Sequence, residues 1–145
     1  GHALAGSAVL ASMLEFATVW AWHSPALHLF ARHSPVGLVA EQGSFLAVGI
    51  WLWATALPPP GEAERRGAGI IGLLLTSMHM TLLGTLLALA PRPLYHAAAG
   101  GHDLADQQLG GTIMLAVAGS AYLLVALWQL ARLLSEDDGQ APTRG

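Results

Sequence analysis

Four long apolar segments dominate this chain and limit what it can fold into. They cover approximately residues 3–22, 36–57, 67–90 and 109–134. Each reaches the roughly 20 residues that an α-helix needs to cross the hydrocarbon core of a membrane. None carries the polar stripe that a helix of a soluble bundle turns toward water, and only 10% of the residues are charged. The sequence therefore predicts an all-α fold, a polytopic membrane four-helix bundle.

The connection between the first two segments has a pattern of its own. Pro25 and Pro35 bracket Ala26–Arg32, a stretch that mixes apolar residues with His28. The stretch is too short to cross a bilayer, and tryptophans precede it at the end of the first segment. We therefore expect a short interfacial helix between spans one and two.

All six basic residues are arginines, and their distribution predicts an orientation. The face with the termini and the connection after span two has four of them: Arg65, Arg66, Arg132 and Arg144. The opposite face has only Arg32 and Arg92. The positive-inside rule makes the first face cytoplasmic. We expect a transmembrane domain at 1–134, then a disordered cytoplasmic tail at 135–145.

Five of the seven histidines fall in the two connections that this orientation makes periplasmic. The first connection contains His23, His28 and His33, and the second contains His96 and His102. Imidazole coordinates transition metals and haem iron. The chain has no cysteine, which excludes disulfides, thiolate metal sites and iron–sulfur clusters. It also lacks the basic stripe of a nucleic-acid-binding protein.

Several residues inside the spans could carry chemistry. Ionisable residues are costly within a membrane and often functional, and here they are Glu15, Glu41 and His79. Met80 and Met114 lie at similar depths, in the half of the bundle nearer the histidine connections. Thioether and imidazole together suit Cu(I). The alternative is that the methionines fill gaps and that the acids and the histidine only fix helix packing.

Helical spacing indicates which way two of these residues face. His79 shares a helix face with Gly72 and Thr76, small residues that let another helix come close. We therefore expect His79 to face protein rather than lipid. Met114 shares a face with Gly111, and Asp106 lies at the mouth of the bundle above it.

Four sequence blocks occur in an order that resembles a known family. They are Trp20–His28, Glu41–Phe45, Met80–Tyr95 and Asp106–Met114. With them the chain resembles the multi-helix CtaG family of cytochrome c oxidase assembly factors, which is unrelated to the single-helix copper chaperone of the same name. The specific stretches are Asp-Gln-Gln-Leu-Gly-Gly and Ala-Pro-Arg-Pro-Leu-Tyr. The chain corresponds to the C-terminal four-span portion of the family.

This resemblance implies an inner-membrane protein that assists haem–copper oxidase assembly, holding or delivering copper on the periplasmic side. Its partners would be oxidase subunits or another membrane complex. The motif positions that it singles out are His23, His28, Glu41, Met80, Asp106, Gln107 and Met114. Together with His79, all of these except Gln107 form our predicted metal-site set. The expected cargo is Cu(I).

Two other classes of function remain to be compared with this one. The chain could be a small accessory subunit of a respiratory or photosynthetic complex, with a structural role. Haem is less expected, because two facing histidines at matched depth are needed and His79 is the only clear mid-span histidine. We do not expect an enzyme, since the chain has no Ser-His-acid set, metalloprotease helix or phosphate loop.

Overall fold

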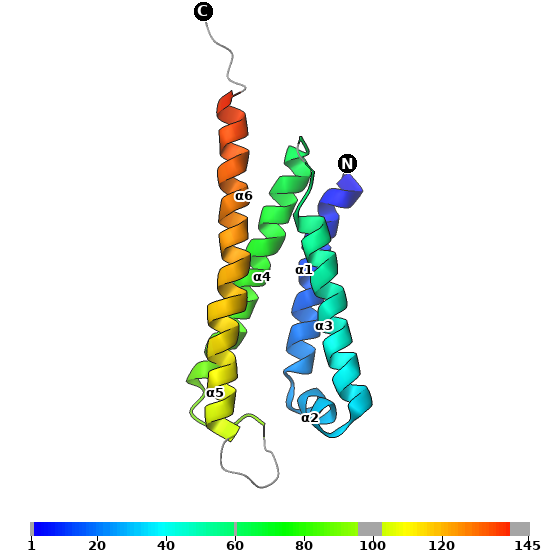
Figure 1. Ribbon diagram of the computed structural model, residues 1–145, viewed down its shortest axis with the longest axis vertical. Helices are drawn as coiled ribbons and strands as arrows, with labels where there is room; N and C mark the ends of the chain where they lie inside the picture. Colours follow the sequence, from blue (N-terminus) through cyan, green and yellow to red (C-terminus); the bar gives the residue numbers. More distant parts are fainter. Residues whose placement is uncertain (1, 60, 96–102, 140–145) are drawn as a thin grey trace, which may run out of the picture.

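The computed structural model describes residues 2–59, 61–95 and 103–139 and consists of long helices that run alongside one another (Figure 1). The long elements are α1 (His2–Trp22), α3 (Pro35–Ala56), α4 (Ala63–Leu89) and one continuous rod made of α5 (Asp103–Ile113), the π-helical segment η1 (Met114–Gly119) and α6 (Ser120–Gly139). The short α2 (Pro25–His33) connects α1 to α3. The predicted four-helix bundle with a short helix between its first two spans is confirmed.

The helices have the length and composition of membrane spans. Three stretches are long and apolar enough to cross a bilayer: Pro35–Ala56, Ala63–Leu89 and Leu104–Ser135. The stretch Ser7–Trp22 of α1 is also apolar but shorter. Many large apolar side chains on the outside of the bundle are exposed, among them Val36 and Leu124. In a membrane protein such residues face lipid.

The end of the last helix differs from the expected boundary. α6 continues to Gly139, so the first part of the tail predicted at 135–145 is helical. Helix propagation adds a hydrogen bond for each residue fixed, and no proline or glycine interrupts the chain between Gly119 and Gly139. The remaining residues of that tail, 140–145, lie outside the described residues.

The two His-Ser-Pro triplets mark the starts of two helices. Pro25 is the first residue of α2 and Pro35 the first residue of α3, where a fixed φ and a missing N–H are tolerated. Ser34 caps α3, because its hydroxyl accepts a hydrogen bond from the Gly37 N–H at 3.2 Å. Ser24 does not cap α2 in this way, because its hydroxyl donates to the Ala21 carbonyl oxygen at 2.6 Å. The shared feature of the two triplets is therefore the proline at the first position of each helix.

α4 is the central helix and packs against α1, α3, α5, η1 and α6. Small residues allow these close approaches: a Cβ on Gly72 would lie 2.8 Å from the Ala8 carbonyl oxygen, and one on Gly84 would lie 2.9 Å from that of Gly111. Gly72, Thr76 and His79 are all buried on α4. The prediction that His79 faces protein is therefore confirmed.

Candidate functional site

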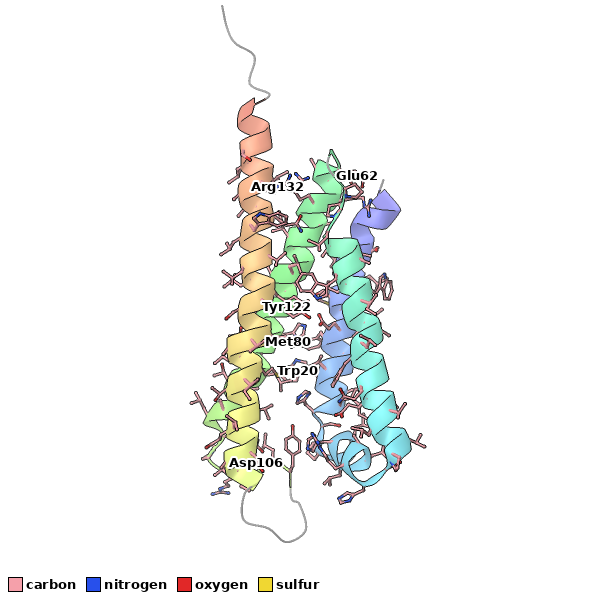
Figure 2. The ribbon with its side chains drawn as sticks, in the orientation of Figure 1. Trp20, Glu62, Met80, Asp106, Tyr122 and Arg132 are labelled. Atoms are coloured by element: carbon pink, nitrogen blue, oxygen red, sulfur yellow. The ribbon has the colours of Figure 1, made fainter. Side chains whose placement is uncertain are left out.

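A cavity of about 1040 Å³ lies between the α1–α3 part of the bundle and the α4–α6 part. Every helix contributes to its wall, and most lining side chains are apolar. The polar ones gather at two levels. We call the level with His23, His28 and Asp106, near α2, the mouth. We call the level with Glu15, Met80 and Tyr122 the floor. Figure 2 shows Met80 and Tyr122 in the middle of the bundle and Asp106 near its α2 end.

The mouth brings the two connections together. The rings of His28 and Tyr95 stack with their centroids 3.9 Å apart, and the Tyr95 hydroxyl donates a hydrogen bond to the His23 carbonyl oxygen at 2.9 Å. The prediction that both histidine-bearing connections emerge at one end of the bundle is thus confirmed. His96 and His102 lie outside the described residues.

A hydrogen bond to the backbone fixes the orientation of the His23 imidazole. Its Nδ1 lies 2.7 Å from the Val19 carbonyl oxygen. Because a carbonyl can only accept, Nδ1–H is the donor, and Nε2 keeps the free lone pair in the neutral ring. A histidine held in this way by a backbone carbonyl is typical of metal ligands.

The pKa values of His28 and Tyr95 at the mouth are shifted in directions that favour their neutral forms. Burial lowers the pKa of His28, and the positive charge of Arg32 lowers it further. The neutral imidazole is the form that binds metal. Burial also raises the pKa of Tyr95, so its hydroxyl stays protonated and can donate to the backbone of His23.

The Asp-Gln-Gln-Leu-Gly-Gly block anchors the connection that carries Tyr95. The Gln107 Oε1 accepts a hydrogen bond from the Leu94 N–H at 2.8 Å, and the Gln108 Nε2 donates one to the Ala90 carbonyl oxygen at 3.1 Å. Gly111 lets α5 lie directly on α4, since a Cβ there would be 2.6 Å from the Ala88 nitrogen. The block therefore positions one wall of the cavity.

Met114 begins the π-helical segment η1. A π-helix bonds i to i+5 and occurs mostly as short bulges, frequently at functional sites. The Ser77 hydroxyl donates a hydrogen bond to the Gly119 carbonyl oxygen at 2.8 Å, at the end of this segment. Met114 lines the cavity, so the bulge shapes the wall where the thioether lies.

The structure brings together most of the predicted metal-site residues but not all of them. Those that line the cavity are His23, His28, Met80, Met114 and Asp106. Glu41 is buried beside it, and its Oε2 accepts from the Gln42 Nε2 at 3.2 Å. Gln42 itself lines the cavity.

His79 lies on a different side of α4 from Met80. Successive residues of a helix are rotated by about 100°, so Met80 lines the cavity while the His79 ring meets Phe16 edge-on, at 5.3 Å between centroids. Neither ring nitrogen of His79 has a hydrogen-bond partner among the described residues. Within the same part of the chain, no three His, Asp or Glu side chains form a metal-binding group. A ligand set in the cavity would therefore combine imidazole with thioether.

Three residues of the site were absent from the predicted set. Glu15 lines the floor, and the sequence marked it only as an ionisable residue inside a span. Tyr95 belongs to the specific Ala-Pro-Arg-Pro-Leu-Tyr stretch, which is the signal that could have found it. Tyr122 carries no comparable signal, because a tyrosine in an apolar span is common.

Comparison with protein families confirms the resemblance that the four sequence blocks indicated. Residues 3–136 match the model of the family described as cytochrome c oxidase caa3 assembly factor (Caa3_CtaG). Searches of curated proteins and of solved structures found no match. The family match covers most of the chain. The chain belongs to the cytochrome c oxidase caa3 assembly factor family.

Proposed function

We propose that this assembly factor holds Cu(I) transiently in the cavity and passes it to the oxidase as the oxidase is built. The observation that carries the proposal is the set of donor atoms around one cavity: the imidazoles of His23 and His28 and the thioethers of Met80 and Met114. Cu(I) is a soft ion that accepts two or three such ligands. Copper is here a cargo, and we infer no catalytic reaction.

The state of the imidazoles supports the same proposal. A histidine must be neutral to bind metal, and burial together with Arg32 lowers the pKa of His28. The Nδ1–H of His23 is already used by the Val19 carbonyl oxygen. Asp106 at the mouth adds negative charge that would attract a cation.

Metal analysis of the purified protein tests the proposal. The protein is solubilised in mild detergent, loaded with Cu(I) under reducing conditions and separated from free metal. We expect the wild type to retain copper, and we expect the double variant His23→Ala, Met114→Leu to retain clearly less of it. Retention of copper by the double variant at the wild-type level would reject the assigned ligands.

The chain offers closely matched controls. Met78 is two residues from Met80 and is 63% exposed on the outside of the bundle, so Met78→Leu removes a thioether that does not line the cavity. His33 is exposed at the end of α2, so His33→Ala removes an imidazole away from the cavity wall. Both variants should retain copper. Circular dichroism and gel filtration check that each variant is folded.

We also propose that the mouth faces the periplasm, because the order of the spans in the sequence assigns four arginines to the opposite side and two to this one. The chain contains no cysteine, so single-cysteine labelling is unambiguous. A membrane-impermeant maleimide should label His33→Cys in intact spheroplasts. It should label Ser135→Cys only after the cells are opened. The reverse pattern would overturn this orientation.

The alternative role, a structural accessory subunit, predicts different behaviour. A subunit would co-purify with a large complex at a fixed ratio, and its loss would destabilise that complex even with copper in excess. Loss of an assembly factor that supplies copper should instead leave an oxidase whose protein subunits are in place but whose copper content is low. Copper supplementation should partly restore that oxidase.

A further inference from the structure

The floor of the cavity contains a buried carboxyl group with an unused oxygen. Glu15 is only 3% exposed and lines the cavity. Its Oε1 accepts a hydrogen bond from the Tyr122 hydroxyl at 2.7 Å, while its Oε2 has no hydrogen-bond partner among the described residues. A carboxylate has about four lone-pair positions to satisfy, so this group lacks part of its normal environment.

No positive side chain among the described residues lies close enough to Glu15 to compensate its charge. In the described part of the chain, no arginine or histidine forms an ion pair with it. The Thr76 hydroxyl is also a neighbour of Glu15. This hydroxyl forms a hydrogen bond with the Ser12 hydroxyl at 2.9 Å between the two oxygens. An isolated carboxylate at the depth of a membrane span is costly. A cation bound in the cavity would balance the charge of the ionised group.

A soft ligand lies at the same level. Met80 is 7% exposed. It lines the cavity together with Glu15 and Tyr122. The three residues come from α4, α1 and α6, and Figure 2 shows Tyr122 and Met80 close in height in the middle of the bundle, far from Asp106 at the mouth. The ring of Tyr122 is held by stacking on Trp53, with centroids 5.2 Å apart.

We propose that the floor is a second, inner position for a soft monovalent cation, where the Glu15 carboxylate balances the charge and the Met80 sulfur is a ligand. The inference rests on the proposed copper cargo and adds a second position to it. Glu15 lies on α1, and His23 follows directly after the last residue of this helix, eight residues further along the chain, which corresponds to about 12 Å at 1.5 Å per residue. One ion cannot contact both, so the mouth and the floor are separate positions for the same cargo.

Titration with Ag(I), a soft monovalent cation that is not redox-active under these conditions, tests the inner position. We expect two equivalents to bind the wild-type protein in detergent. Glu15→Gln keeps an oxygen to accept the Tyr122 hydrogen bond but removes the charge, and it should bind one equivalent. Met80→Leu keeps the carboxylate and should also lose the inner equivalent. The double variant His23→Ala, His28→Ala should lose the equivalent bound at the mouth and keep the inner one.

Matched controls separate charge and sulfur effects from general damage. Glu62 is paired with Arg65 near the start of α4, and Glu62→Gln should still bind two equivalents. Met78→Leu, on the outside of the bundle, should do the same.

The outcomes distinguish the two proposals. Two equivalents bound by both Glu15→Gln and Met80→Leu would overturn the inner position, and so would a wild type whose single equivalent is lost only in the histidine variant. In both cases the proposed copper cargo would stand. A wild type that binds no Ag(I) and no Cu(I) would overturn both.

Discussion

Gly110 and Gly111 are neighbours on α5, yet replacing each by alanine should have opposite effects. A Cβ on Gly111 would lie 2.6 Å from the Ala88 nitrogen, 2.7 Å from the Gly84 carbonyl oxygen and 2.7 Å from the Leu87 Cβ. Two of these atoms belong to the backbone and cannot rotate away. A Cβ on Gly110 would meet nothing within 4 Å.

The magnitude follows from these distances. To reach an ordinary contact of 3.4 Å, the atoms nearest to Gly111 must move about 0.8 Å from 2.6 Å. Such overpacking typically costs about 1–3 kcal/mol. In contrast, Gly110→Ala introduces a residue with a helix propensity about 1 kcal/mol better than that of glycine. The two variants should therefore differ in the free energy of unfolding by about 2–4 kcal/mol.

Thermal unfolding in detergent, followed by circular dichroism, measures the difference. We expect Gly111→Ala to melt several degrees below the wild type and Gly110→Ala to melt at or above it. Because Gly111 is three residues before Met114, Gly111→Ala should also shift the thioether and weaken copper retention. Equal melting temperatures for the two variants would refute the argument that α4 and α5 are in direct backbone contact at this point.

Three further predictions concern hydrogen bonds and charge. Ser77→Ala leaves the Gly119 carbonyl oxygen at the end of the π-helical segment without its donor and should lower the free energy of unfolding by about 1 kcal/mol, measurable as a lower melting temperature. Gln129→Leu leaves the last carbonyl group of α3 without the amide that Gln129 donates, and should cost about 1–3 kcal/mol because the site is buried; an unchanged melting temperature would contradict this. Burial and Arg32 lower the pKa of His28 in the folded protein, so the neutral imidazole stabilises the fold above its ordinary pKa and this contribution is lost as the pH falls. Arg32→Gln should raise the His28 pKa, seen by NMR titration, and copper should then be released at a higher pH than from the wild type.

The hydrophobic pattern alone was sufficient for the architecture. Each apolar segment is long enough to span a membrane, and backbone groups in lipid must be paired within the segment, so four helices follow directly. Two spans separate the two histidine connections along the chain, so both connections lie at the same end of the bundle, as the Tyr95–His23 hydrogen bond confirms. Helical period also predicted that His79 is buried, because a stripe of small residues marks a contact face.

The membership of the cavity was decided only by tertiary structure. Depth along a helix can be counted from sequence, but the rotation of each helix about its axis is set by packing. Met80 therefore lines the cavity while the adjacent His79 packs against Phe16. In the same way, Gln42 lines the cavity and the adjacent Glu41 does not.

Long-range pairs were beyond sequence reasoning for the same reason. Glu15 and Tyr122 are 107 positions apart, and nothing local indicates that one will bond to the other. Likewise, the π-helical segment that begins at Met114 ends at a hydrogen bond from Ser77 of another helix. Local period determines which residues form a helix, whereas the contacts between helices determine which side chains share a site.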